Sequence, residues 1–121
     1  MTTRLFVYGT LAPGCDAWPV LAPWATGTPR EDTVDGVLYD TGRGYPAAVF
    51  DGHDAGRVHG HVVDLDPVRA AEALVALDSY EGGEYERITV RTAGGVEATT
   101  YAWIAPLRDC RPVEDGRWDR S

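Results

Sequence analysis

The chain has 121 residues, with eleven arginines, no lysine and nineteen carboxylate side chains, so its net charge at neutral pH is −8. A strongly negative protein repels nucleic acid and anionic membranes, and the absence of lysine excludes Schiff-base chemistry and a phosphate-loop lysine. The apolar share of 44% and the charged share of 25% are ordinary values for a single globular domain, which we expect to span residues 1–121.

Neither a membrane span nor a secretory signal is predicted. No apolar run is long enough to cross a bilayer, and strand-like sequence begins almost at once, leaving no room for a signal peptide. We therefore expect a cytoplasmic protein. Cys15 and Cys110 stand far apart, and the sequence is compatible either with two idle thiols or with one bridge. Nothing in the sequence indicates an oligomeric state.

The first predicted element is a strand that ends in a tight loop. Leu5–Tyr8 is rich in aromatic and β-branched residues, which suit a buried strand, and Gly9, Pro13 and Gly14 then interrupt it. Because glycine has no Cβ, the backbone at Gly9 can approach a ligand closely, and such a loop can turn its N–H groups toward an anionic or carbonyl oxygen. A hairpin turn that binds nothing is the alternative interpretation.

The middle of the chain predicts strands followed by a helix. Residues 18–24 are apolar but contain two prolines, which favours a short helical turn or an extended cover over a long helix. The one convincing helix begins with Asp66 as N-cap and Pro67 at the first helical position, and it ends by Gly82–Gly83. Strands bounded by turn residues are predicted over 33–40, 47–50 and 57–65.

The last two predicted strands, 85–92 and 97–104, form a hairpin around Gly94–Gly95, and a polar tail follows from Pro106. Six strands, one good helix and short connections favour an α+β fold, a small mixed or antiparallel barrel-like domain with the helix covering one side. A doubly wound α/β fold would need more helices than the sequence predicts.

A second informative stretch, residues 77–87, places four carboxylates within nine residues at the helix exit. A carboxylate at a helix C-terminus faces the negative end of the helix dipole, and neighbouring like charges raise its proton affinity further. If Glu81 also points into a partly apolar pocket, its pKa rises toward the range that suits a general base. A solvated acidic turn is the alternative interpretation.

Both stretches resemble the γ-glutamylcyclotransferase superfamily. Tyr8–Leu11 with a following glycine is similar to the signature loop, and Leu77–Gly82 before Tyr85–Arg87 is similar to the Leu-Asp-x-aromatic-Glu-Gly motif and its Tyr-x-Arg strand. Tyr45–Ala47 and Val113–Trp118 resemble the aromatic-Pro-Ala start of the third strand and the closing Gly-x-Trp tail. The matches follow the family order, and they are most similar to the γ-glutamylamine cyclotransferase-like, or avirulence-induced-gene-like, branch.

The resemblance implies an enzyme that releases 5-oxoproline and a free amine from a small γ-glutamyl amide, by attack of the α-amine on the γ-carbonyl and without metal or cofactor. Glu81 matches the catalytic acid/base of the family. The N–H groups of the loop suit either the oxyanion or the substrate's α-carboxylate. Arg87 is predicted to pair with a neighbouring glutamate in preference to a substrate carboxylate. The substrate-binding candidates are the loop and two further tyrosines: Tyr8, Gly9, Thr10, Leu11, Tyr85 and Tyr101.

Three alternatives stay open. Cys15–Pro19 replaces a polar, histidine-containing segment of many relatives, so the leaving amine is not identified. A non-catalytic binding module for a small molecule or peptide is the alternative function, and Glu81 argues against it because cyclisation needs a carboxylate there.

His59 and His61 share one face of a strand and would form a metal site with His53, but solvated strand histidines are the favoured interpretation, and we predict no metal.

Overall fold

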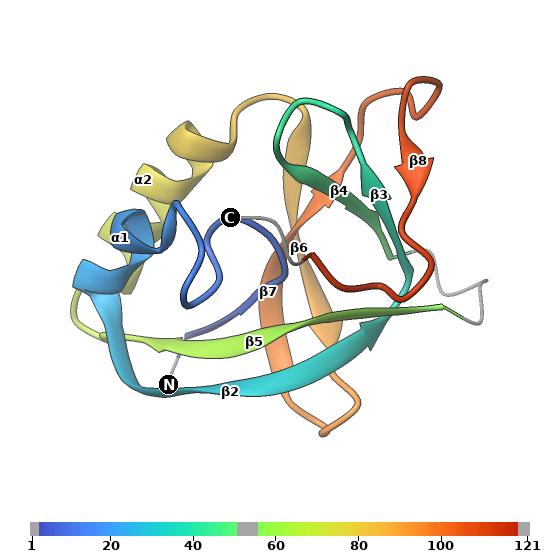
Figure 1. Cartoon of the computed structure of the whole chain (residues 1–121). Coiled ribbons are helices and arrows are strands. Elements are labelled where there is room, and N and C mark those ends of the chain that lie inside the picture. Colours follow the sequence, from blue (N-terminus) through green and yellow to red (C-terminus); the bar gives the residue numbers. More distant parts are fainter. Residues whose placement is uncertain (1–2, 51–55, 119–121) are drawn as a thin grey trace.

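The computed structural model describes residues 3–50 and 56–118. In that part of the chain, two sheets pack with two short helical segments and one longer helix (Figure 1). The strands are β1 (Arg4–Val7), β2 (Ala25–Asp35), β3 (Val37–Asp40), β4 (Pro46–Val49), β5 (Arg57–Leu65), β6 (Tyr85–Arg91), β7 (Glu97–Trp103) and β8 (Arg111–Pro112). The helices are α1 (Trp18–Leu21), the 3₁₀ turn η1 (Ala22–Trp24) and α2 (Ala70–Glu81).

The larger sheet has the strand order β2-β5-β1-β7-β6, and the smaller sheet has the order β4-β3-β8. Strand β1 lies at the centre of the larger sheet, antiparallel to β5 and parallel to β7. Both α-helices lie together beside the larger sheet, at the left of Figure 1, while β3, β4 and β8 lie at its upper right. The α+β class is confirmed, although the strands form two sheets and not one closed barrel.

Strand β1 is apolar after its first residue, Arg4, and both faces of this apolar part are covered. Leu5 and Val7 pack into a core cluster with α2, which contributes Leu77 among others. Phe6 and Tyr8 point to the opposite face and join a second cluster with residues of β2, β3 and β5. A strand that is buried on both faces carries a continuous apolar run, as the sequence of β1 does. The cavity described below begins where β1 ends.

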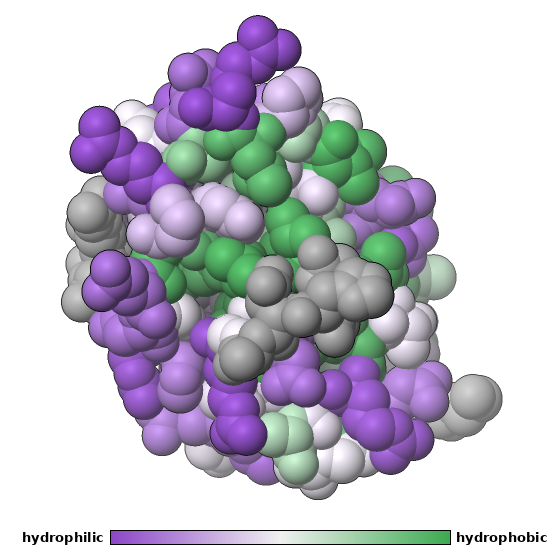
Figure 2. Space-filling view, turned by 90° about the vertical axis from the view of Figure 1, so that its right-hand side faces the viewer, coloured by the Kyte–Doolittle hydropathy of each residue, from purple (hydrophilic) through white to green (hydrophobic). Residues whose placement is uncertain are grey.

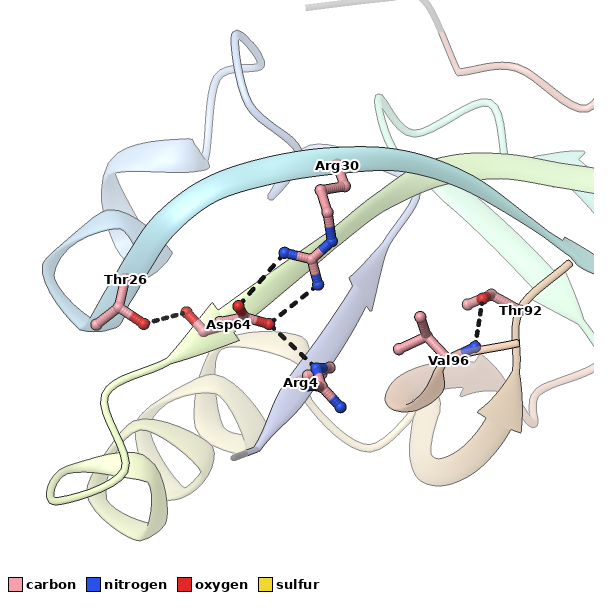
Figure 3. Close-up of polar contacts among 6 residues, drawn as sticks. All are labelled: Arg4, Thr26, Arg30, Asp64, Thr92 and Val96. Atoms are coloured by element: carbon pink, nitrogen blue, oxygen red, sulfur yellow. Dashed lines mark hydrogen bonds and ion pairs between the residues drawn. The ribbon is translucent and has the colours of Figure 1, made fainter. Parts of the chain in front are cut away.

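A partly exposed polar cluster joins three neighbouring strands (Figure 3). The carboxylate of Asp64 on β5 pairs with Arg4 Nε of β1 at 3.3 Å and with Arg30 Nη2 of β2 at 3.2 Å. The Thr26 hydroxyl donates to the Asp64 carbonyl oxygen at 3.4 Å. The β2–β5 register shifts between Thr26 and Arg30. Because exposed ion pairs contribute little stability, the cluster serves mainly to hold β2 on both sides of this irregularity.

Three differences of more than one residue separate the element boundaries from the sequence prediction. Strand β2 begins at Ala25, well before the strand predicted from residue 33. Helix α2 begins at Ala70 and not at Pro67. The Asp66 carboxylate does act as a cap, but it accepts the Val68 N–H at 3.0 Å and so closes a separate turn ahead of the helix. The strand predicted over 33–40 is two strands that meet at Gly36, where a Cβ would lie 2.6 Å from the Val49 carbonyl oxygen. The close approach lets the chain pass from the larger sheet to the smaller one.

The polar tail contains a strand that the sequence did not predict. Strand β8 pairs antiparallel with β3, and Val113 N–H donates to the Leu38 carbonyl oxygen at 2.8 Å. The predicted β6–β7 hairpin is confirmed, and the Thr92 hydroxyl accepts the Val96 N–H at 3.1 Å inside its turn (Figure 3). Short edge strands such as β8 carry no periodicity by which a sequence can reveal them.

The molecular surface is mixed in character. Figure 2 shows the side on which β3 and β8 lie in Figure 1, and on it hydrophobic atoms gather toward the middle while hydrophilic side chains surround them. None of the helices in the described ranges has the length and apolar character needed to span a bilayer. The large hydrophobic residues that are exposed are Val68, Val75, Tyr80 and Ile104.

Candidate active site

A cavity of about 410 Å³ lies between the loop that follows β1, the β3–β4 loop and the C-terminal end of α2. We call it the Glu81 cavity. Strand β7 and the start of β6 complete its wall. Every residue that the sequence singled out for catalysis or substrate binding lines it: Tyr8, Gly9, Thr10, Leu11, Glu81, Tyr85 and Tyr101.

The loop after β1 is shaped by its own backbone. Ala12 N–H donates to the Gly9 carbonyl oxygen at 3.0 Å, and Ala17 N–H donates to that of Thr10 at 2.9 Å. A Cβ at Gly9 would lie 2.6 Å from Pro46 Cγ, so only glycine allows the loop to pack against β4. The N–H groups of residues 9–11 donate to no acceptor within 3–50 and 56–118. They are therefore available to an oxygen atom of a ligand.

Glu81 is the last residue of α2. The helix ends there because Gly82 adopts a positive φ of 81°, which favours glycine, and its N–H donates to the Asp78 carbonyl oxygen at 3.1 Å. Burial raises the pKa of the Glu81 carboxyl from 4.5 to about 7, because the charged form loses hydration. The direction agrees with the sequence prediction, and the cause is the burial that this prediction named as its condition.

Three tyrosines of the cavity use their hydroxyls to join distant segments. Tyr8 Oη donates to the Tyr101 carbonyl oxygen at 2.5 Å, and Tyr101 Oη donates to Asp78 Oδ1 at 2.7 Å. Tyr85 Oη donates to the Pro46 carbonyl oxygen at 2.6 Å. Burial is the main cause that raises the pKa of all three hydroxyls, so they stay protonated at neutral pH. Each serves as a fixed wall of the cavity.

Two ion pairs flank the cavity. Arg87 Nε lies 2.9 Å from Asp78 Oδ1, so the predicted internal ion pair is present, although its acidic partner is an aspartate. Arg43 Nη2 lies 3.0 Å from Glu84 Oε2 and joins the β3–β4 loop to the α2–β6 turn. The Arg43 guanidinium also lies 5.1 Å from the centre of the Tyr45 ring. Both arginines beside the cavity are thus bound to carboxylates other than Glu81.

Sequence reasoning missed seven lining residues: Phe6, Val7, Gly44, Tyr45, Pro46, Tyr80 and Glu84. Pro46 is central to the site, because it packs against Gly9 and its carbonyl oxygen accepts the Tyr85 hydroxyl. The only signal for it was the resemblance of Tyr45–Ala47 to a family motif. Glu84 had no signal beyond its place in an acidic stretch.

A second cavity of about 420 Å³ lies on the other side of the loop after β1, against β2, β5 and the C-terminal tail. We call it the His59 cavity, and Tyr8 borders both cavities. His59 and His61 line it, whereas His53, the third ligand considered above, is outside the residues that the structure describes. Within the described ranges no group of three or more potential metal-ligating side chains occurs. Cys15, which also lines it, and Cys110 are free thiols.

Comparisons with known proteins agree with this fold. The model of the family described as "Gamma-glutamyl cyclotransferase, AIG2-like" matches residues 5–120. The solution structure of protein ytfP from Escherichia coli is 34% identical, with a TM-score of 0.64, and the alignment covers 97% of this chain and 96% of that one.

Two crystal structures extend the comparison. YkqA from Bacillus subtilis is 26% identical with a TM-score of 0.74; the match covers 98% of this chain but only 40% of YkqA, so this chain spans less than half of that protein. An AIG2-like protein from Mus musculus is similar in fold, at 18% identity and a TM-score of 0.75, with 98% of this chain and 88% of that one covered. No curated protein matches the sequence.

Proposed function

The chain belongs to the AIG2-like gamma-glutamyl cyclotransferase family, and we propose that it is a cyclotransferase that releases 5-oxoproline and a free amine from a γ-glutamyl amide. One observation supports this above all: burial raises the pKa of the Glu81 carboxyl to about 7 in a cavity that also offers unpaired backbone N–H groups. A carboxyl with this pKa is populated in both protonation states near neutral pH. It can therefore accept a proton and return it within one reaction.

The first step forms the ring. The α-amino nitrogen of the substrate attacks its own γ-carbonyl carbon, and a new N–C bond closes a five-membered ring. The ionised Glu81 carboxylate takes a proton from this nitrogen, which would otherwise remain a non-nucleophilic ammonium. Because nucleophile and electrophile belong to one molecule, the cavity needs only to hold the chain folded with the two atoms in contact.

The second step releases the amine. The tetrahedral carbon collapses, the C–N bond to the leaving group breaks, and protonated Glu81 donates its proton to the departing nitrogen. The proton count balances with two transfers. The α-ammonium begins with three hydrogens and the lactam nitrogen keeps one; Glu81 carries one proton to the departing nitrogen, and the ring nitrogen loses the second to solvent before the collapse. The released amine takes up one proton from solvent and becomes an ammonium. The proposed steps need no covalent enzyme intermediate.

The N–H groups of residues 9–11 suit two oxygens of such a substrate. They can stabilise the negative charge that develops on the γ-carbonyl oxygen, as preorganised donors do in other acyl transfers. They can equally hold the α-carboxylate and so orient the amine. In both roles the proton transfers stay with Glu81.

The test is 5-oxoproline release measured by mass spectrometry from a panel of γ-glutamyl amides and γ-glutamyl amino acids, with wild type beside Glu81→Gln. We expect release by wild type alone, and the preferred substrate identifies the leaving amine. An active Glu81→Gln variant would overturn the mechanism. If wild type releases nothing while 5-oxoproline or glutamate raises the melting temperature of both proteins, the chain is instead a binding module.

A further inference from the structure

Helix α2 carries a second carboxylate one turn before Glu81, and this residue, Asp78, accepts the hydroxyl of Tyr101, which lines the cavity. We propose that Asp78 is a positioning residue: it holds the Arg87 guanidinium on its own carboxylate and so prevents Arg87 from forming an ion pair with Glu81. The catalytic importance of this arrangement rests on the function proposed above, in which Glu81 moves a proton. The arrangement itself can be tested without any substrate.

Asp78 binds two side chains through one oxygen atom. Its Oδ1 lies 2.9 Å from Arg87 Nε and accepts the Tyr101 hydroxyl at 2.7 Å. Arg87 of β6 and Tyr101 of β7 are direct partners in the antiparallel register, so the two donors approach Asp78 from one patch of the sheet. Both donors bind the Asp78 carboxylate, and this carboxylate holds the Arg87 guanidinium beside the end of α2.

Glu81 is the acidic residue next to Asp78 on the surface of α2. Residues three apart on a helix are neighbours on its surface, so the side chains of Asp78 and Glu81 emerge next to each other. The charge of Arg87 acts to lower the pKa of the Tyr101 hydroxyl, and the charge of Glu81 acts to raise it. Without the Asp78 carboxylate, the guanidinium would have Glu81 as an acidic partner one helical turn away.

That exchange would change the chemistry of Glu81. An opposite charge in contact lowers the pKa of a carboxyl by about 1–3 units. In the present arrangement burial alone raises the pKa of Glu81, and no cation offsets it. Glu81 paired with Arg87 would be a weaker base, and it would take the proton from the α-ammonium less readily.

Arg87 is the cation that could pair with Glu81, and the other charged and titratable groups around Glu81 do not supply a cation in its stead. Burial keeps the hydroxyls of Tyr8, Tyr85 and Tyr101 protonated at neutral pH, and Arg43 is bound to Glu84. The full set of charged and titratable groups around the cavity end of α2, with Arg87 included, is as follows: Asp78 and Tyr80 on α2, Tyr8 after β1, Arg43 and Tyr45 in the β3–β4 loop, Glu84 in the α2–β6 turn, Tyr85 and Arg87 on β6, and Tyr101 on β7.

The experiment is an NMR titration of the glutamate side-chain carboxyl carbons in the whole protein, without substrate. The Glu81 signal is assigned by its loss in Glu81→Gln. Asp78→Asn keeps an oxygen that can accept the Tyr101 hydroxyl but removes the charge that holds Arg87. We expect it to lower the titration midpoint of Glu81 by about 1–3 units, the effect of a contacting cation. Adding Arg87→Gln to this variant should bring the midpoint back toward the wild-type value.

A matched control lies on the same helix. Glu72 pairs with Arg69 at 3.3 Å near the start of α2, and Glu72→Gln should leave the Glu81 midpoint unchanged. An unchanged midpoint in Asp78→Asn, or one that stays low in the double variant, would overturn the inference. If Asp78→Asn does not fold, Asp78→Ser removes the same charge and keeps a hydroxyl oxygen for Tyr101.

The titration also separates this inference from the proposed function. If the proposed function is wrong, wild type releases no 5-oxoproline, whatever the titration midpoint of Glu81. If the inference is wrong, the Glu81 midpoints of the variants do not shift as expected, whatever the activity. For an active enzyme, Asp78→Asn should in addition move the acid limb of the pH–rate profile to lower pH, which loss of a merely structural contact would not do.

Discussion

The Glu81 cavity and the His59 cavity are nearly equal in volume, at about 410 and 420 Å³, and Tyr8 and the loop after β1 separate them. Each contains a partly buried carboxylate whose pKa is shifted, but in opposite directions. Burial raises the pKa of Glu81 to about 7. Burial also acts to raise the pKa of Asp32, but hydrogen bonds from Thr92, Thr33 and Gly94 outweigh it, and the net pKa is lowered.

The difference lies in what surrounds each carboxylate. Asp32 Oδ1 accepts the N–H groups of Thr33 at 2.8 Å and Gly94 at 3.1 Å, which stabilise the ionised form and fix the β6–β7 turn against β2. In the part of the chain that the structure describes, no comparable donor offsets the burial of Glu81. The two cavities therefore cannot be told apart by their volume. What distinguishes the Glu81 cavity is a carboxyl that can be either protonated or ionised at neutral pH.

The largest expected effect is on activity. Glu81→Gln should lower kcat/KM for 5-oxoproline release by about 10²–10⁴-fold, the usual contribution of a general acid/base. Glu31→Gln is the matched control, since this exposed glutamate lines the His59 cavity and should be dispensable. Steady-state kinetics on one substrate compares them, and equal losses in both variants would show that the two cavities do not differ as proposed.

The next effect is on stability. A folded-state pKa above the unfolded value means that the folded protein binds more protons, so wild type should lose stability as the pH rises from 4.5 to about 7. The shift corresponds to about 3 kcal/mol. Glu81→Gln should therefore be more stable than wild type above pH 7, with the difference shrinking toward pH 4.5. Urea unfolding across this range measures it, and a difference that does not depend on pH would contradict the burial of an ionisable Glu81.

A smaller effect is expected at the wall that the two cavities share. Gly9→Ala places a methyl group 2.6 Å from Pro46 Cγ and should cost about 1–3 kcal/mol of stability, as overpacking does. It should also lower 5-oxoproline release by displacing the loop. Gly83→Ala is the control, because a Cβ there meets nothing within 4 Å. Thermal unfolding of both variants gives the comparison, and an unperturbed Gly9→Ala would mean that the loop does not depend on its contact with β4.

Local patterns were sufficient to predict those parts of the fold that are determined locally. Strand β5 was predicted from the turn residues that bound it, and the end of α2 at Gly82 was predicted from glycine. The division of 33–40 into two strands depends on the contact of Gly36 with Val49, and β8 depends on its pairing with β3. Contacts between residues far apart in sequence leave no local pattern, so these features could not be predicted.

The same limit applies to the site. The loop at Tyr8–Leu11 and Glu81 were singled out by motif resemblance, and they do line one cavity. The contact between Gly9 and Pro46, which brings the loop to the cavity, joins two motifs that the sequence shows only as separate stretches. The sequence could name burial only as a condition for a raised pKa of Glu81, because burial depends on every segment around the cavity.

The smallest expected effect tests the carboxylate of the His59 cavity. Asp32→Ala removes the acceptor for two backbone N–H groups and should cost about 1 kcal/mol at neutral pH. Because the folded-state pKa of Asp32 is lowered, its stabilisation is present above the unfolded value of 3.8 and is lost as the pH falls through the folded-state pKa. Measured by urea unfolding, the stability of wild type minus that of Asp32→Ala should therefore be positive and rise with pH. The stability of wild type minus that of Glu81→Gln should instead become more negative as the pH rises. If these two signed differences changed with pH in the same direction, the contrast between a hydrogen-bonded structural carboxylate and a buried proton carrier would be wrong.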